Sequence, residues 1–127
     1  MAEKTIVLCD TNIIIDLLKD KQKIVIEIKD IGEDSIYISS ITAAELYFGA
    51  LNKEELNKIR KRLNRIIHIP INETITEIFE NLMINYSLSH KLGIPDAIIA
   101  ATAIHYSIPL YTLNKKDFYF IPEIILY

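Results

Sequence analysis

Acidic residues that stand just beyond short apolar runs constrain the fold of this chain more than any other feature. Asp10, Glu45 and Asp117 each come after such a run, and Asp96 stands where a helix is expected to begin. Short apolar runs that alternate with helical stretches predict parallel strands joined by crossover helices. Because sites in such sheets form beyond the carboxyl ends of the strands, we expect these carboxylates to converge in one cleft.

A cluster of carboxylates has a chemical consequence. Its members repel one another unless a cation lies among them. The usual cation is Mg²⁺ or Mn²⁺, and the usual chemistry of such a site is on phosphate esters. The pattern of acids therefore predicts a divalent-metal site.

Length and composition limit the alternatives. A chain of 127 residues, half of them hydrophobic, is expected to form one domain over residues 1–127. Its net charge of −3 argues against binding nucleic acid through overall charge. The single cysteine, Cys9, excludes an internal disulfide, suits a reducing cytoplasm and is expected to be an inert core thiol. Residues 1–4 do not resemble a signal peptide, and we expect no membrane span.

The hydrophobic pattern predicts a three-layer α/β/α sandwich with a central, mostly parallel sheet. We expect strands at 5–9, 35–39, 67–69 and 109–112, and a last edge strand at 124–126. We expect helices that end near 18, cover 22–31, begin at 42 and cover 54–66, 72–89 and 95–106, with one helical turn at 115–119. Predicted caps are Thr11 or Asn12 for the first helix, Thr42 for the third and Asn72 for the fifth, and Gly32 ends the second.

Asp10 and Glu45 each have a structural explanation beside the functional one. Asp10 could simply cap the helix that follows its strand. Glu45 could form a capping box with Thr42, three positions earlier. Against this, Ile41, Glu45 and Phe48 share one helix face, and a carboxylate on an apolar face is costly unless it is paired or binds metal.

The acids in the second half of the chain are also open to two interpretations. Asp96 could complement the dipole of the helix that it begins. It shares a face with Ala100 and Ala103, however, and such small side chains would let the helix pack closely and fix the depth of Asp96. Asn114 and Asp117 could belong to an ordinary turn.

Four motifs carry a resemblance to a known family. They are VLCDTN at 7–12, ITAAELYFG at 41–49, PDAIIAATA at 95–103 and TLNKKDF at 112–118. In this order and spacing they resemble the PIN-domain nucleases, and most closely the VapC toxins of type II toxin–antitoxin pairs. The resemblance covers nearly the whole chain.

The resemblance implies an endoribonuclease that depends on Mg²⁺ or Mn²⁺. Asp10, Glu45 and Asp96 match the acidic residues of the family. The fourth position is open between Asn114 and Asp117; we favour Asp117 as a metal ligand and Asn114 as an oxygen donor or a water-positioning residue. Thr11 and Asn12 would contact the metal ligands without binding the metal themselves.

The resemblance also implies partners, namely an RNA substrate, a VapB-like antitoxin and a second copy of the chain. Exposed cations for RNA are expected at Lys115 and Lys116 beside the site, and at Arg62 and Arg65 on a charged helix that could equally be a solvated face. Tyr47, Phe48 and Tyr86 could stack a base, although core packing explains at least two of them better.

Other classes of function remain in view. The three histidines lack metal-ligand spacing, so a histidine-based ribonuclease is disfavoured. A phosphotransfer domain could use an aspartate after the first strand, but no Asp-x-Asp follows that strand. A non-enzymatic interaction domain would use its acids only as helix caps. Binding of Mn²⁺ would separate the nuclease from both alternatives.

Overall fold

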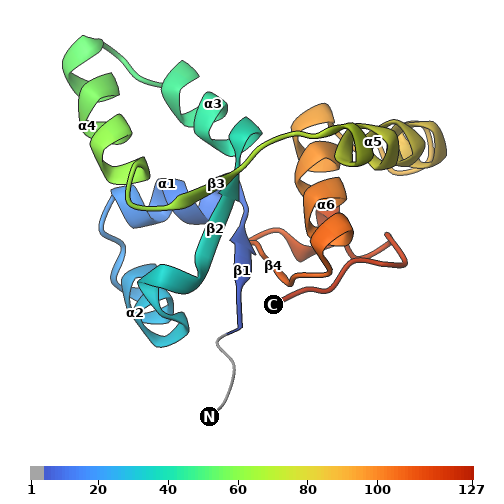
Figure 1. Cartoon of the computed structure of the whole chain (residues 1–127), viewed down its shortest axis with the longest axis horizontal. Helices are drawn as coiled ribbons and strands as arrows, with labels where there is room; N and C mark the ends of the chain where they lie inside the picture. The colour runs from blue at the N-terminus through green and yellow to red at the C-terminus, as the bar shows by residue number, and fades with distance from the viewer. Residues whose placement is uncertain (1–4) are drawn as a thin grey trace.

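The computed structural model describes residues 5–127 and places a parallel sheet between two groups of helices (Figure 1). The strands are β1 (Val7–Cys9), β2 (Ile36–Ser39), β3 (Ile67–Ile69) and β4 (Leu110–Tyr111). The helices are α1 (Thr11–Leu18), α2 (Gln22–Ile31), α3 (Ser40–Phe48), α4 (Lys53–Leu63), α5 (Glu73–Tyr86) and α6 (Ile94–Tyr106), with short 3-10 turns η1 (Glu33–Ser35) and η2 (Lys115–Asp117). The predicted α/β/α sandwich is confirmed. The expectation for residues 1–4 lies outside the described residues.

Strand β1 occupies the interior of the sheet, whose order is β3-β2-β1-β4 with every pairing parallel. Leu8 is paired with Tyr37 on one side and Leu110 on the other. All three residues of β1 are fully buried, because helices cover both faces of the sheet. This is why the strand reads as a continuous apolar run rather than an alternating one.

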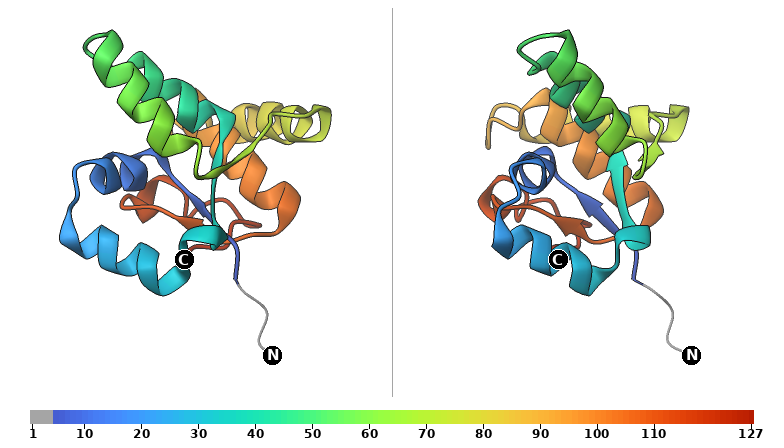
Figure 2. Two further views of the ribbon diagram at one scale, coloured as in Figure 1. Left: turned by 60° about the vertical axis from the view of Figure 1, so that its left-hand side comes forward. Right: turned by 90° about the vertical axis from the view of Figure 1, so that its left-hand side faces the viewer.

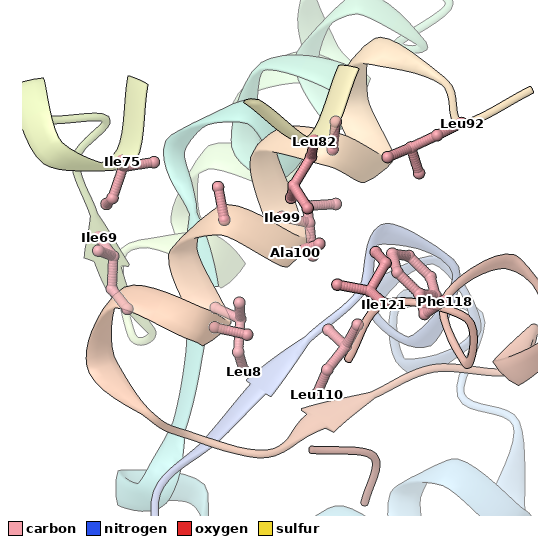
Figure 3. Packing of buried hydrophobic residues seen from close by; sticks show 13 residues of the cluster. Leu8, Ile69, Ile75, Leu82, Leu92, Ile99, Ala100, Leu110, Phe118 and Ile121 are labelled. Carbon is pink, nitrogen blue, oxygen red and sulfur yellow. The ribbon is translucent and has the colours of Figure 1, made fainter. Parts of the chain in front are cut away.

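The pleat of β1 divides the core into two parts. Leu8 belongs to the cluster under α5 and α6, whereas Cys9 belongs to the cluster under α1, α2, α3 and α4. Figure 3 shows the first cluster, in which Leu92, Phe118 and Ile121 gather beside Ile99 of α6. Figure 2 shows α3 and α4 as a helical pair, and α3 also contacts α1 and α6. Helix α3 therefore lies where the two halves meet.

Most element boundaries follow the sequence expectations. Helix α2 covers 22–31 and ends at Gly32, strand β3 covers 67–69, and Asn72 caps α5, all as predicted. Two predicted caps are wrong. Asp10, not Thr11 or Asn12, caps α1, which confirms the structural interpretation of Asp10, and Ser39, not Thr42, caps α3. Asp10 is the one residue between β1 and α1, and Ser39 is the last residue of β2 directly before α3, so in both cases a polar residue at the end of the strand region becomes the cap.

Several segments are shorter than expected. The strands predicted at 5–9 and 109–112 reduce to Val7–Cys9 and Leu110–Tyr111. The edge strand predicted at 124–126 is wrong: it reduces to one bridge between Leu126 and Leu110, because a two-residue β4 offers little backbone to pair with. None of the helices described within 5–127 is long and apolar enough to cross a bilayer.

Candidate active site

Asp10 is the most firmly held of the predicted site residues. It follows β1 and caps α1, and it is 5% exposed. Its Oδ1 accepts a hydrogen bond of 2.7 Å from the Thr11 N–H, and its Oδ2 accepts one of 2.8 Å from the Thr112 hydroxyl. Asp10 therefore caps α1 and also stands at the carboxyl edge of the sheet. Each oxygen keeps a further lone pair, so these bonds leave the carboxylate able to accept another partner.

The loop after β4 is tied to the same edge. The Thr112 hydroxyl accepts a 3.0 Å hydrogen bond from the Asn114 N–H, and Asn12 Oδ1 accepts one of 3.4 Å from the Leu113 N–H. Thr112 is 4% exposed, whereas Asn114 is exposed. Sequence reasoning gave Thr112 no role of its own. The available signal was the strand register, because a parallel pair that aligns Cys9 with Tyr111 also brings Asp10 beside Thr112.

Glu45 reaches the site from α3. The Thr11 hydroxyl oxygen lies 2.8 Å from Glu45 Oε1 and 3.0 Å from Thr42 Oγ1. The predicted capping box is therefore wrong: Thr42 is fully buried within α3 and contacts Thr11 instead of the helix end. The predicted apolar face is only partly correct, because Ile41 packs against the core but Phe48 is 93% exposed.

Asp96 and Asp117 come from the other half of the molecule. Asp96 lies in the first turn of α6, beside Pro95, and Asp117 ends η2. Ala100 and Ala103, which share a helix face with Asp96, are buried, as expected for a helix that packs closely. Because α6 runs back from the carboxyl edge of the sheet towards β4, its first turn lies at the same edge as Asp10.

The four carboxylates are close enough to influence one another. Burial raises the pKa of Asp10, and the charges of Glu45 and Asp117 raise it further against two hydrogen bonds that lower it. Burial raises the pKa of Asp96 to about 6, and the charges of Asp10, Asp117 and Glu45 add to that effect. Glu45 and Asp117 are thus close enough to influence the pKa values of Asp10 and Asp96, and the assignment of all four to one metal site is a proposal.

No cation balances this charge within residues 5–127. The ion pairs of that part of the chain are Lys21 with Asp16 and Lys58 with Glu54, both outside the cluster. The four carboxylates therefore form a net negative site, which is a setting that favours a bound cation.

The donor set fits a partly hydrated ion. In the described part of the chain, no three acidic, histidine or cysteine side chains are arranged so that they could hold a metal ion by themselves. Mg²⁺ does not need such a cage, because it keeps several waters and is usually held by only one or two carboxylates. Asp10 and Asp96, the most strongly perturbed of the four, are the residues that would hold it.

The four predicted RNA-binding cations lie in three different places. Lys115 and Lys116 are exposed in η2, directly before Asp117. Arg62 lies on α4 and lines a cavity of about 620 Å³ that also reaches Glu45. Arg65 follows α4 and lines a smaller cavity of about 250 Å³, which Arg62 also lines. The lysines therefore adjoin the carboxylates, Arg62 lies across a groove from them, and Arg65 lies away from them.

The expectations that Cys9 is an inert core thiol and that the histidines form no metal site can be compared with the structure. Cys9 is fully buried, and burial followed by the charge of Asp10 raises the pKa of its thiol to about 12, which agrees with an inert thiol. His68 Nε2 lies 2.9 Å from the Leu63 carbonyl oxygen, and His90 packs against aromatic rings at the surface. Neither histidine joins a metal-ligand cluster in the described chain.

Comparison with known proteins shows to which family the chain belongs. The family model of the PIN domain matches residues 7–123. The chain belongs to the PIN-domain family. This confirms the resemblance inferred from the four motifs, and the position of Asp10 after the first strand, with the other acids around it, is the arrangement that the resemblance implied.

The relatives narrow the type of PIN domain. "Ribonuclease VapC" of Rickettsia bellii is 34% identical over 102 residues, covering 72% of this chain and 74% of that protein. A toxin–antitoxin complex from Klebsiella pneumoniae contains a chain that is 34% identical, with 94% of this chain and 95% of that chain covered and a TM-score of 0.78. VapBC2 of Rickettsia felis, crystallised with a promoter DNA fragment, gives 28% identity, coverage of 97% and 98%, and a TM-score of 0.83. This PIN domain is thus VapC-like.

Proposed function

We propose that this PIN domain is a divalent-metal-dependent endoribonuclease and the toxin of a VapBC-type toxin–antitoxin pair. The observation that carries the proposal is the grouping of Asp10, Glu45, Asp96 and Asp117, whose charges raise the pKa values of Asp10 and Asp96, with no ion pair to any of the four in residues 5–127. The likeness to proteins named ribonuclease VapC supports the choice of RNA as substrate.

The side chains of the chain have distinct tasks in this proposal. Asp10 and Asp96 would hold a Mg²⁺ or Mn²⁺ ion, and Glu45 and Asp117 would orient water and phosphate. When bound, such an ion stabilises charge on the phosphate oxygens and lowers the pKa of water. Thr112 and Thr11 fix the orientation of Asp10 and Glu45 through hydrogen bonds. Asn114 contributes its backbone N–H to that framework and is not a ligand.

Positive charge beside the site would bind the RNA backbone. Lys115 and Lys116 are exposed next to Asp117, and we propose that they contact phosphates on either side of the cleaved bond. Arg62 would contact RNA only if the strand followed the groove past Glu45. Arg65 is exposed and does not line this groove, and we assign it to the solvated face.

The groove between α1, α3 and α4 suits the antitoxin. It is lined by both apolar and charged side chains and includes Thr11 and Glu45, so a segment that fills it would also cover these two residues. Its apolar residues are Ile15, Leu18, Leu46 and Ile59. We propose that an apolar segment of a VapB-like antitoxin binds there, because the solved relatives include toxin–antitoxin complexes.

A homodimer is the second proposed assembly. The isoleucines of α1 are only partly available for it, since Ile13 and Ile14 are fully buried in the core. Phe48 and Leu51, between α3 and α4, are 93% and 86% exposed, and we propose that a second copy covers them. Sedimentation of the native chain as a monomer at high micromolar concentration would contradict this assembly.

The proposed activity is tested by incubating the protein with single-stranded and structured RNA in Mg²⁺ or Mn²⁺. We expect internal cleavage that EDTA stops, and activity that survives exhaustive chelation would contradict the proposal. A small phosphodonor tests the phosphotransfer alternative. We expect no labelling, because no Asp-x-Asp follows β1.

A further inference from the structure

Four aromatic side chains gather at the surface between the α5–α6 loop and the segment after η2. We call Tyr86, His90, Tyr119 and Phe120 the aromatic cluster. The His90 ring stacks on Phe120 with centroids 4.0 Å apart and planes at 13°. Tyr86 meets His90 at 5.7 Å and Phe120 at 5.2 Å, and Tyr119 meets Phe120 edge-on at 6.0 Å.

Each of the two chain segments that carry the aromatic cluster lies close in sequence to a proposed site residue. His90 precedes Asp96 by six positions, and Phe120 follows Asp117 by three. Three residues span at most about 11 Å even when fully extended, so Phe120 cannot lie far from that carboxylate.

Core packing beneath the aromatic cluster holds its two segments together. Leu92, from the loop that carries His90, packs in the same buried cluster as Phe118 and Ile121, which flank the other two aromatic residues (Figure 3). The support is therefore built from buried side chains, and the rings above it are not free to move apart.

The exposure of these rings is not explained by the fold. His90 is exposed and Tyr119 is 68% exposed, while Phe120 and Tyr86 are half-buried beneath them. Lys91, Lys115 and Lys116 are exposed in the same two segments, and none of them belongs to an ion pair within residues 5–127. Exposed aromatic faces interleaved with unpaired cations are the combination that binds single-stranded nucleic acid.

We propose that the aromatic cluster is a stacking platform for an unpaired base of the RNA substrate. A base next to the cleaved phosphate stacks on the face offered by His90 and Tyr119, while its backbone follows Lys115 and Lys116. The inference rests on the proposed ribonuclease activity and deepens it, because stacking requires a base that is not already paired. Single-stranded or looped RNA is therefore the substrate form, and continuous duplex is not.

The chain offers a matched control for the test. His105 and Tyr106 form another surface pair of aromatic rings, with centroids 4.5 Å apart, at the far end of α6 from Asp96. A helix of 13 residues separates the two ends by about 18 Å. The experiment compares His90→Ala/Tyr119→Ser with His105→Ala/Tyr106→Ser and with the native chain.

Binding is measured by fluorescence anisotropy of a labelled single-stranded RNA of mixed sequence, with Ca²⁺ replacing Mg²⁺ to suppress cleavage. We expect the first variant to bind about tenfold or more weakly, since loss of one stacked base commonly has that effect, and the control variant to bind like the native chain. Cleavage of the same RNA in Mn²⁺ should fall through a raised KM rather than a lowered kcat. Tyr119→Phe, which keeps the ring, should retain native binding.

A series of RNAs with one abasic site each identifies the stacked base. At one position the abasic RNA should bind the native protein as weakly as intact RNA binds the first variant, and combining both changes should add nothing. Equal binding by the first variant and the native chain, in a protein that still cleaves RNA, would overturn the platform and leave the activity standing. A native chain that neither binds nor cleaves RNA would overturn both. A first variant that sediments as a smaller species would assign the cluster to a subunit interface and overturn the proposal.

Discussion

The Thr112 hydroxyl donates a 2.8 Å hydrogen bond to Oδ2 of Asp10, although 102 positions separate the two residues. Parallel pairing of β1 with β4 brings them together, because Cys9 is aligned with Tyr111 just before them. The bond opposes the effect of burial on the pKa of Asp10 and so favours the ionised carboxylate. A neutral side chain after the last strand thus helps to set the charge of an acid after the first.

Thr112→Val should lower both stability and activity. The substitution keeps the shape but leaves a buried carboxylate oxygen without its donor, which costs about 1–3 kcal/mol of unfolding free energy. RNA cleavage should fall about 10–100-fold, the usual effect of removing a group that orients a metal ligand. Thermal melts and cleavage rates measure the two effects.

The control is Thr102→Val. Thr102 is also fully buried, and its hydroxyl donates a 2.8 Å bond to the Ile98 carbonyl oxygen within α6. We expect cleavage to be unchanged and the loss of stability to be smaller, because the Ile98 carbonyl oxygen keeps its hydrogen bond to a helix N–H. If both variants lose activity in proportion to their stability, Thr112 has no orienting role.

Asp117→Asn and Asn114→Ala decide between the two candidates for the fourth site residue. Asp117 raises the pKa of both Asp10 and Asp96, whereas Asn114 is exposed and joins the framework through its backbone N–H. We therefore expect Asp117→Asn to reduce cleavage by 10-fold or more. Asn114→Ala should leave cleavage within about twofold of native, since it keeps the N–H. The reverse order of rates would make Asn114 the ligand.

Sequence alone could predict the acids and the sheet edge, but not the groups that hold them. Asp10 and Asp96 stood out because they follow an apolar run and a helix-starting proline. Thr42 looked like a helix cap because its spacing to Glu45 fits a capping box. Its contact with Thr11 depends on how α3 packs against α1, which no local pattern encodes.

The surface features were harder to anticipate for the same reason. Tyr86 was one of three predicted stacking candidates, with Tyr47 and Phe48, and it is half-buried against His90 and Phe120. The aromatic cluster joins residues 34 positions apart, from Tyr86 to Phe120, and the two segments meet through their rings and through a buried cluster that includes Leu92 and Phe118.

The stability of the metal-free chain should fall as pH rises from about 4 to above 6. Asp96 has a pKa of about 6 in the folded chain against an ordinary 3.8, so in this range the folded state holds a proton that the unfolded state has lost. Stability therefore decreases with pH wherever the folded state binds more protons. The stabilising contribution is fully present below pH 3.8 and is lost through pH 6. Urea unfolding in EDTA at several pH values measures it.

The same series with Asp96→Asn isolates the group responsible, because the amide does not titrate. The difference in unfolding free energy between native and variant should change across pH 4–6 and be flat above about pH 7. A difference that does not vary with pH would show that Asp96 keeps an ordinary pKa.

Asp96→Asn should abolish cleavage and make the metal-free chain more stable at pH 7.5. Neutralising one of four carboxylates relieves their repulsion and the cost of burying the charge, which we expect to be worth about 1 kcal/mol, or about 4 °C in Tm. Without this ligand, cleavage should fall at least about 100-fold. Mn²⁺ should raise the Tm of the native chain and leave that of the variant nearly unchanged.

A purely structural role for Asp96 predicts the opposite sign. If it only complemented the dipole of α6, the substitution would destabilise the chain by about 0.3–1 kcal/mol and leave cleavage intact. Glu73→Gln provides the matched reference, because Glu73 is an exposed acid in the first turn of α5 and lies outside the site. We expect Glu73→Gln to lose a few tenths of a kcal/mol with native activity. An Asp96→Asn chain that behaves like Glu73→Gln, less stable but fully active, would place the metal site elsewhere.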